Sequence, residues 1–366
     1  MFSEETLYAI ALRHCPSIGD FYFKKLVTLV GSAKNVWGMS PHELNKRYGI
    51  SSKVSSHIGK DEHLFFAEKE LEFCYHSHIK ILLSHRGELP GLLQQCEDAP
   101  SILYQKGKFH FKNKNISIVG TRSCTSYGKN FITGFLEAIK ASKIQTISGL
   151  ALGTDTTVHS ESLKNRVPTV AILAHGFRSL YPSKNKILAE RILEDGALLS
   201  EFTSHQPPLK ENFIQRNRII AGISPATIIT ETAYAGGAIS TAHFANRYNR
   251  KVLALPGPIH QPIHQGCNLL IAQNKARILI SIPDTLDYLH MNPTSQKSLE
   301  LFPPQPLLSN AEQRILLSLI VERPNISLEE ISEKVDWPSY RILPILLDLE
   351  LLGCIKSTSG RLYAPI

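Results

Sequence analysis

The residues that decide the fold are 116–122, which read Ile-Ser-Ile-Val-Gly-Thr-Arg. The first four are aliphatic or small at both alternating positions, which is the pattern of a strand buried on both faces. The glycine and the arginine that follow place a flexible turn and a positive charge directly after that strand. The stretch therefore predicts a strand of a parallel sheet that ends at a polar turn.

Six further short apolar runs share this pattern, at residues 145–148, 169–174, 197–200, 226–230, 251–255 and 277–280. Helical patterns separate them, near residues 126–141, 156–165, 185–195, 212–222, 237–249 and 267–274. Strands that alternate with helices are typical of a doubly wound parallel sheet. We therefore predict an α/β fold with an extended Rossmann-like sheet over residues 81–285.

Two smaller regions flank the predicted sheet. Residues 1–80 have the pattern of short helices and are similar to a SAM-like or helix-hairpin-helix module, which is either a structural cap or a phosphate-binding turn. Residues 286–308 are rich in proline, serine and glutamine, which predicts a linker. Residues 309–366 predict three helices and a hairpin, as in a winged helix. This last region either reads DNA or contacts protein.

Composition excludes several classes of protein. The chain has 366 residues, of which 43% are hydrophobic and 20% are charged, so it is globular rather than disordered. It has no apolar run long enough for a membrane span and no signal-peptide pattern at the first residues. Its six cysteines include no C-x-x-C, and H-E-x-x-H, P-loop and G-x-S-x-G motifs are absent. We expect a cytoplasmic protein with reduced thiols, no metal, no cofactor and no catalytic residues.

Positive charge is concentrated in the middle of the chain. The formal net charge of +8 divides into +1 over residues 1–80, +10 over 81–299 and −3 over 300–366. Residues 101–130 contain six basic side chains and no acidic one: Lys106, Lys108, Lys112, Lys114, Arg122 and Lys129. Such a block indicates either an anionic partner or a solvated, lysine-rich surface.

The ends of the predicted strands carry glycine and polar residues. These include Gly120-Thr121-Arg122, Ser148-Gly149, Gly153-Thr154-Asp155, Ser200-Glu201, and Glu231 with Gly236-Gly237. In an open α/β sheet, ligands bind at the carboxyl ends of the strands. Because no turn fits G-x-G-x-x-G, these residues predict a continuous anion site and not a standard dinucleotide site.

Two groups of residues in this region suit nucleic-acid binding. Backbone N–H groups of Gly120 and Thr121, at the start of the following helix, are expected to hold a phosphate, and Arg122 adds a planar cation. Lys210 and Phe213 lie three residues apart, which places a cation and an aromatic ring on one helical face. Phe213 either stacks on a base or packs in the core.

The motifs, in order, resemble the DNA-processing protein A (DprA/Smf) family of bacterial natural transformation. The matching stretches are Ser117–Arg122, Ser148–Asp155, Ser200–Phe202, Arg216–Gly222, Gly237–Ala242, Pro256-Gly257 and Gly266–Ile271. The match covers roughly residues 85–285. Two departures are Leu152, where the family has a polar residue, and Ala235-Gly236-Gly237, where it has Ser-Gly.

The resemblance implies a single-stranded DNA-binding protein that forms a homodimer, protects incoming DNA and loads the recombinase RecA onto it. The family is not regarded as enzymatic. The residues expected to contact DNA are Gly120, Thr121, Arg122, Ser148, Gly149, Lys210, Phe213, Arg216, Asn217, Arg218, Gly237 and Thr241. Arg216 and Arg218 have a second interpretation, in which they brace the loop through hydrogen bonds to carbonyl groups.

Two other functions remain alternatives. The strand-end glycines with Glu231 resemble the nucleotide-phosphate hydrolases of the "lonely guy" type, although their P-G-G-x-G-T order is missing here. A transcriptional regulator acting through residues 309–366 is the second alternative, and the acidic balance of that region argues against it.

Overall fold

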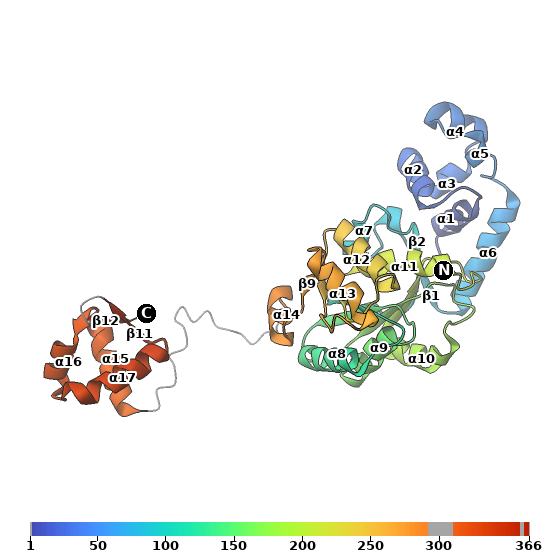
Figure 1. Ribbon diagram of the computed structural model, residues 1–366. Helices are drawn as coiled ribbons and strands as arrows, with labels where there is room; N and C mark the ends of the chain where they lie inside the picture. The colour runs from blue at the N-terminus through green and yellow to red at the C-terminus, as the bar shows by residue number, and fades with distance from the viewer. Residues whose placement is uncertain (1, 292–309, 359–361, 366) are drawn as a thin grey trace. The chain divides into compact units, whose positions relative to one another are not determined.

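A mostly parallel β-sheet forms the centre of the first of two units, residues 1–293 and 294–366 (Figure 1). The computed structural model describes residues 2–291, 310–358 and 362–365, and within these residues the sheet has nine strands. Their order is β1 (Ile79–Leu83), β2 (Ile102–Gly107), β6 (Ala197–Ser200), β5 (Thr169–Ile172), β4 (Ile144–Ser148), β3 (Lys114–Val119), β7 (Ala226–Ile229), β8 (Lys251–Ala254) and β9 (Arg277–Ile278).

From β6 across the sheet to β9, each strand is parallel to the next. At the other edge β1 pairs with β2, and β2 with β6, in antiparallel fashion. Every residue of β4 is buried, as expected for a strand covered on both faces. The predicted doubly wound parallel sheet is confirmed, and the seven predicted strands correspond to β3 through β9. The antiparallel pair is an addition that the sequence pattern did not predict.

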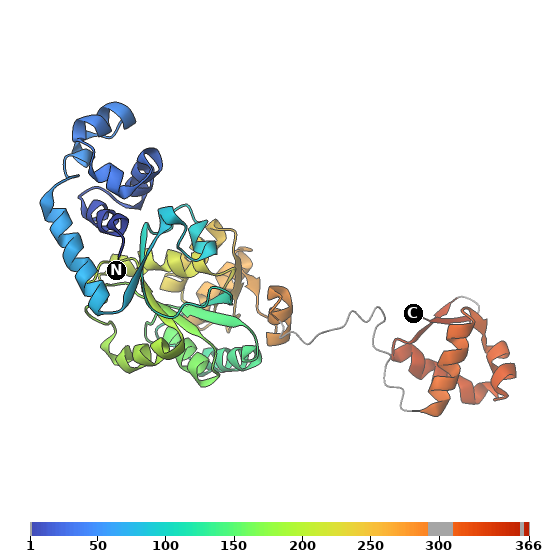
Figure 2. The ribbon, with the colours of Figure 1, turned by 180° about the vertical axis from the view of Figure 1, so that it is seen from behind.

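Helices cover both faces of the sheet. One face packs against α7 (Gly91–Gln94), α11 (Lys210–Ile223), α12 (Gly237–Arg247) and α13 (Pro262–Ala272). The other face packs against α8 (Ser126–Ile139), α9 (Thr154–Lys164), α10 (Lys186–Asp195) and α14 (Ile282–Leu289). Figure 2, which shows the unit from behind, gives the same two layers. Short 3₁₀ turns lie at η1 (Ser84–Arg86) and η2 (Ser183–Asn185).

The direction in which strands are added reverses between β3 and β7. From β3 the chain adds β4, β5 and β6 on one side, and it then returns to add β7, β8 and β9 on the other. At such a reversal the connections after the two adjacent strands run to opposite faces of the sheet and leave a crevice between them. The fold therefore provides one favoured ligand position, at the carboxyl ends of β3 and β7.

The N-terminal residues form helices that pack beside the β1 edge (Figure 1). They are α1 (Glu4–His14), α2 (Asp20–Val30), α3 (Ala33–Trp37), α4 (Pro41–Tyr48), α5 (Ser52–Ser55) and α6 (Asp61–His76). Their hydrophobic core includes Ile79, Ile81 and Leu83 from β1. The predicted boundary at residue 80 therefore falls inside a strand, because this strand belongs to the sheet and to the helical core at once.

The expected linker at residues 286–308 begins too early. Helix α14 extends to Leu289, and the side chains of Leu286 and Leu289 are buried against the sheet. These residues belong to the first unit because their apolar side chains complete its core. The remainder of the expected linker, residues 292–308, lies outside the described residues.

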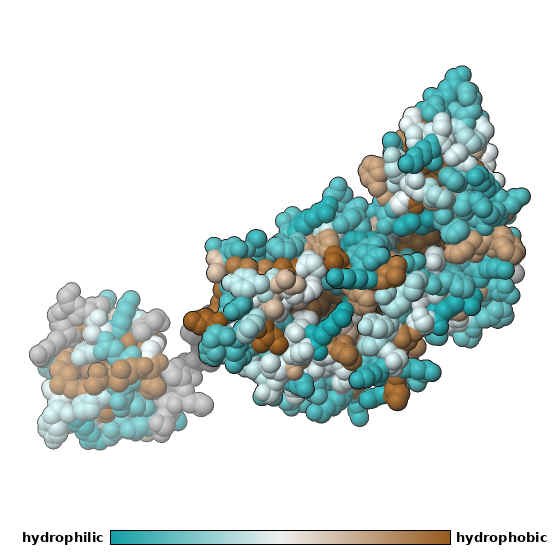
Figure 3. Space-filling view, turned by 45° about the vertical axis from the view of Figure 1, so that its right-hand side comes forward, coloured by the Kyte–Doolittle hydropathy of each residue, from teal (hydrophilic) through white to brown (hydrophobic). Residues whose placement is uncertain are grey.

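The second unit combines three helices with a small sheet. Its elements are α15 (Ala311–Glu322), β10 (Ile326–Ser327), α16 (Leu328–Val335), α17 (Ser339–Leu351), β11 (Ile355–Thr358) and β12 (Leu362–Pro365). Ser327 and Glu330 form the capping box expected at the start of α16. The space-filling view shows a band of hydrophobic side chains on this unit (Figure 3). Exposed hydrophobic residues of α17 include Leu343, Leu347 and Leu351.

All six cysteine thiols are free. Among the helices of the described residues, none has both the length and the apolar character that a membrane crossing requires.

Candidate nucleic-acid interface

A cavity of about 300 Å³ lies at the reversal point between β3 and β7. The turn after β3, the helix α11, the turn after β7 and the first residues of α12 form its walls. Eight of the residues predicted to contact DNA line it: Gly120, Thr121, Arg122, Phe213, Arg216, Asn217, Gly237 and Thr241. Four others, Ser148, Gly149, Lys210 and Arg218, do not line it.

Arg122 is an exposed cation at the mouth of this cavity. Its guanidinium carbon lies 5.3 Å from the centre of the Phe213 ring, which is within the range of a cation–π contact. Among the described residues, no carboxylate forms a salt bridge with Arg122. Its charge is therefore available to an anionic ligand.

Phe213 lies at the cavity and outside the hydrophobic core. The ring is half-buried and makes a T-shaped contact with the ring of Tyr181, with 5.8 Å between the ring centres. Tyr181 is a contact that the sequence pattern did not indicate, because it lies 32 residues before Phe213 in an irregular segment. Phe213 is therefore part of the cavity wall, and its stacking on a base stays a prediction.

Buried hydrogen bonds and close packing fix the conformation of the turn that carries Arg122. Glu231 is fully buried at the end of β7 and accepts hydrogen bonds from Thr125 through both carboxylate oxygens, one of them from the backbone N–H at 2.9 Å. Gly120 packs so closely that a Cβ there would lie 2.5 Å from the hydroxyl oxygens of Thr154 and Thr230. Only glycine fits at this position, and the turn is consequently well defined.

The predicted phosphate cradle at Gly120 and Thr121 needs correction. Helix α8 begins at Ser126 and is capped by Thr125, so the two residues precede the first helical turn by several positions. Helix α12 presents its N-terminus to the cavity. Its N-cap, Gly236, has no side-chain cap, and a Cβ at Gly237 would meet only open space. The first turn of α12 therefore offers backbone N–H groups and the positive end of a helix dipole to an anion.

Helix α11 is tied to α12 beside this turn. The side-chain amide of Asn217 donates to the carbonyl oxygen of Gly237 at 3.2 Å and to the hydroxyl oxygen of Ser240 at 2.9 Å. The two helices also form one of the largest helix–helix contacts of the first unit. Asn217 thus fixes the position of Phe213, one turn away on the same helix, relative to the first turn of α12.

Arg216 braces the floor of the cavity. Its side chain is buried, and it donates to the carbonyl oxygens of Gly149, at 2.8 Å, and Ile172. Burial lowers the pKa of Arg216 to about 10, so the group remains charged at neutral pH. Burial also raises the pKa of Asp155, while the charge of Arg216 acts in the opposite direction. The bracing interpretation of Arg216 is confirmed by these hydrogen bonds.

Ser148 and Gly149 were predicted as contacts, and the structure corrects this. Ser148 is fully buried, and its hydroxyl donates to the carbonyl oxygen of Ile118 at 2.7 Å. Gly149 is buried beneath the cavity, where a Cβ would lie 2.7 Å from the guanidinium of Arg216. Both residues support the floor because their polar groups already have partners within the protein.

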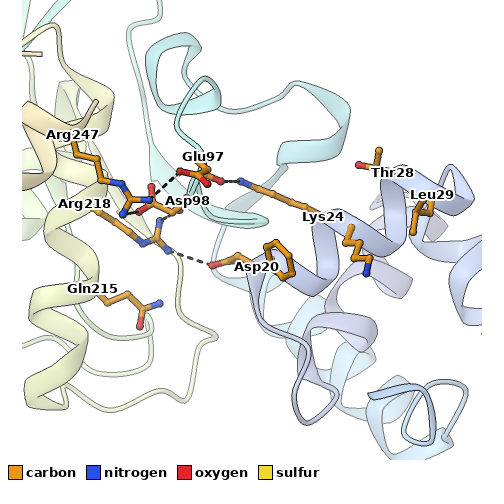
Figure 4. A pocket seen from close by; sticks show the side chains of 11 residues that line it. Asp20, Lys24, Thr28, Leu29, Glu97, Asp98, Gln215, Arg218 and Arg247 are labelled. Atoms are coloured by element: carbon orange, nitrogen blue, oxygen red, sulfur yellow. Dashed lines mark hydrogen bonds and ion pairs between the residues drawn. The ribbon is translucent and has the colours of Figure 1, made fainter. Parts of the chain in front are cut away.

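Arg218 lies in a different cavity, of about 680 Å³, on the other side of α11 (Figure 4). Its guanidinium pairs with Asp20, at 3.3 Å, and with Glu201, and it donates to the carbonyl oxygen of Asp98 at 2.6 Å. The Arg218 side chain is only 8% exposed. The prediction that Arg218 contacts DNA is therefore wrong for this structure: its donors are engaged by the protein.

The basic residues within 101–130 do not lie together: some are at the amino ends of the parallel strands and others at the carboxyl ends. Lys114 is the first residue of β3, so it lies at the amino end of the strand, opposite the cavity. Its ammonium group donates to the carbonyl oxygen of His290 at 2.8 Å. Lys108, near the same end of the sheet, pairs with Asp195 at 3.5 Å. Arg122 is the residue of this run that lines the cavity. Lys210 is exposed at the first position of α11, one turn before Phe213.

Comparison with known proteins identifies the family to which the chain belongs. A family model described as DNA recombination-mediator protein A matches residues 80–290, more than half of the chain. Protein Smf of Escherichia coli is 32% identical over 278 residues, which are 74% of this chain and 73% of that protein. DNA processing protein DprA of Streptococcus pneumoniae is 32% identical over 232 residues, 63% of this chain and 77% of that protein.

Solved structures give the same result. An X-ray structure of DprA from Streptococcus pneumoniae superposes with a TM-score of 0.66 at 28% identity, covering 77% of this chain and 97% of that one. The structure of DNA processing protein A from Helicobacter pylori, at 24% identity and a TM-score of 0.53, has a similar fold over 59% of this chain and 97% of that one. On these matches, the chain belongs to the DprA/Smf family of DNA recombination-mediator protein A.

Proposed function

We propose that the cavity between β3 and β7 binds single-stranded DNA. The observation that carries the proposal is the exposed Arg122, which has no ion-pair partner among the described residues and lies over the ring of Phe213 at the first turn of α12. Binding of single strands without sequence preference combines phosphate-binding cations with aromatic faces for the bases. Arg122 and the N-terminus of α12 supply the first property, and Phe213 supplies the second.

The relatives support this proposal. The Helicobacter pylori protein is one whose structure addresses its single-stranded DNA binding mode. The Streptococcus pneumoniae and Bacillus subtilis relatives carry the name DNA processing protein. We propose the same class of function here, in the processing of incoming DNA during transformation.

The sequence argument for a nucleotide-phosphate hydrolase is weaker in the structure. That alternative needed Glu231 near a ribose phosphate, and both oxygens of Glu231 accept hydrogen bonds from Thr125. Glu231 does not line the cavity. Hydrolysis of a nucleoside monophosphate by the full-length chain would favour this alternative over the DNA-binding proposal.

Two further parts of the proposal rest on the family. We propose that the chain forms a homodimer and that it loads RecA onto the bound strand. Sedimentation of the full-length chain over a range of concentrations tests the first, and a monomer throughout would reject it. Faster RecA filament formation on protein-coated single strands tests the second, and an unchanged rate would reject it.

Competition for a labelled oligothymidylate tests DNA binding itself. Unlabelled oligothymidylate should displace the label at much lower concentrations than duplex DNA, because the bases must reach Phe213. Arg122→Ala should weaken binding about tenfold or more, since a hydrogen bond to a charged group contributes about 1.5–3 kcal/mol. The matched control is Lys112→Ala, which removes one exposed charge near the opposite end of the parallel strands. Equal affinities of the two folded variants would reject the proposal.

A further inference from the structure

The N-terminal helices bring together a group of side chains that bears no relation to the DNA cavity. His57 lies in the turn between α5 and α6, and Glu62 and His63 lie in the first turn of α6. Their potential ligand atoms, two imidazole nitrogens and a carboxylate oxygen, all lie within 4.8 Å of one another. His63 Nε2 and Glu62 Oε1 are 3.5 Å apart.

Two nitrogens of this group are buried without a hydrogen-bond partner among the described residues: Nδ1 of His57 and Nε2 of His63. The His63 residue is only 4% exposed. Buried polar atoms in folded proteins almost always have a partner, so each such atom calls for a specific explanation. A metal ion held between the two nitrogens and the carboxylate accounts for both.

The other nitrogen of His63 is held in the way that a metal-binding histidine requires. Its Nδ1 lies 2.9 Å from Nδ1 of His14, so one of the two nitrogens donates a hydrogen bond to the other. When His63 is the donor, the lone pair of its Nε2 is directed toward Glu62 and His57. The ring of His14 stacks on Phe66 at 3.7 Å, which fixes this partner in turn. Metal-binding histidines usually hydrogen-bond through the second nitrogen in this manner.

The thiol nearest the group does not belong to the ligand set. Cys15 is buried, and its sulfur donates to the carbonyl oxygens of Ala11 at 3.4 Å and His57 at 3.5 Å. The second contact positions the backbone of His57, whose ring lies in a T-shaped arrangement with that of His63, with 6.2 Å between the ring centres. The set is therefore two imidazole nitrogens and one carboxylate oxygen, a combination that suits zinc and similar divalent ions.

We propose that His57, Glu62 and His63 bind one divalent transition-metal ion of the zinc class. The ligands of a tetrahedral zinc lie roughly 3.3 Å apart at bond lengths of about 2.0–2.1 Å. The observed 3.5 Å between His63 and Glu62 is close to that separation. Glu62, whose side chain is 66% exposed, gives the ion a path from solvent. The bound ion would cross-link the turn between α5 and α6, through His57, to the first turn of α6, through Glu62 and His63.

The sequence did not indicate this site because its spacing is His-x₄-Glu-His, which is neither C-x-x-C nor H-E-x-x-H. His14, which holds His63, lies 49 residues away in the chain. Only the packing of α1 against α6 brings these groups together.

Titration of the metal-free, full-length chain with Zn²⁺ against a chromophoric chelator tests the proposal. We expect one saturable site per chain, and Co²⁺ in its place should give the visible spectrum of tetrahedral coordination. Glu62→Gln keeps the size of an exposed side chain, so folding should be unaffected, and it should weaken Zn²⁺ binding more than tenfold. His14→Ala should weaken binding about 10–100-fold, because it removes the partner that orients His63.

The control for loss of a histidine is His42→Ala, an exposed position on α4 in the same helical region. It should leave Zn²⁺ affinity unchanged. Equal affinity of the wild type, Glu62→Gln and His42→Ala, or the absence of a saturable site in the wild type, would overturn the proposal. Glu62→Gln should also bind oligothymidylate normally, so failure of the metal site and failure of the DNA site would be distinguished.

Discussion

Helix α11 has a cavity on each side, and both cavities are lined by arginine. In the smaller cavity Arg122 is exposed and forms no salt bridge with any described carboxylate. In the larger one Arg218 pairs with Asp20 and Glu201, and Arg247 pairs with Glu97 at 3.1 Å (Figure 4). The difference separates an arginine whose charge the protein neutralises internally from one whose charge it leaves available.

The two arginines should respond to substitution in opposite ways. Loss of Arg122 should weaken DNA binding and leave stability nearly unchanged, because the side chain is exposed. Loss of Arg218 should lower stability, because it leaves Glu201 and Asp20 without a buried cation. The predictions below test this contrast, from the largest expected effect to the smallest.

At pH 8, where Glu201 is ionised, Arg218→Ala should lower the free energy of unfolding of the first unit by about 3–5 kcal/mol, as expected when one partner of a buried ion pair is removed. Urea denaturation monitored by circular dichroism measures the change. The matched control is Arg247→Ala in the same cavity, where the side chain is 55% exposed and solvent screens its ion pair, so the expected cost is small. Equal costs for the two variants would contradict the structural role of Arg218.

Glu201 should make the stability of this region depend on pH. Burial raises the pKa of Glu201 to about 7, with the charge of Arg218 acting in the opposite direction. The folded chain holds this proton more tightly than the unfolded chain. Protonated Glu201 therefore contributes to the free energy of unfolding at pH 4.5, and this contribution is lost as the pH rises through 7.

The stability of the wild type relative to Glu201→Gln should therefore fall by about 3 kcal/mol between pH 4.5 and pH 8. Denaturation of both proteins at a series of pH values measures this difference. If the stability of the wild type relative to Glu201→Gln instead rises with pH, Arg218 holds Glu201 as a carboxylate.

Phe213→Ala should weaken oligothymidylate binding by about 1–3 kcal/mol, the usual effect of losing one stacking platform. Fluorescence anisotropy with the folded variant measures the affinity. Phe111→Ala is the control, since Phe111 is an exposed aromatic residue that does not line the cavity. Normal binding by Phe213→Ala would assign the ring a packing role only.

Arg341→Ala should change the affinity for both single-stranded and duplex DNA by less than about twofold. Arg341 pairs with Glu312 and lies 4.7 Å from the centre of the Trp337 ring, so its charge already has partners. Its helix, α17, exposes Leu343 and Leu347 instead of further cations. A large fall in duplex affinity would support the alternative in which residues 309–366 read DNA.

The sequence predicted the parallel sheet well because buried parallel strands leave a short, continuous apolar run that needs no knowledge of distant residues. The β1–β2 pair was not predicted, since its strands are separated by η1 and the short helix α7 and join the sheet at an antiparallel edge. The start of the linker was misplaced for a similar reason. Leu286 and Leu289 follow a proline and are buried through contacts with strands and helices that are distant in the sequence.

The sequence placed Arg122 and Phe213 at the candidate cavity, and their contact with DNA stays a prediction. Arg122 comes directly after β3, and Phe213 faces the cavity from the first turn of α11. Arg218 could not be assigned in this way, because its partner Asp20 lies 198 residues away in the N-terminal helices. Motif spacing gives the position of a charge along the chain, but only the packed structure shows whether another side chain neutralises it.

The salt dependence of oligothymidylate affinity tests the central claim most directly. For single strands, each phosphate contact contributes about 0.7 to the slope of log affinity against log salt concentration. Arg122→Ala should reduce the magnitude of the wild-type slope by about 0.7, and Lys112→Ala should leave it unchanged. An unchanged slope for Arg122→Ala, or an equal reduction for Lys112→Ala, would contradict the assignment of a phosphate to the Arg122 cavity.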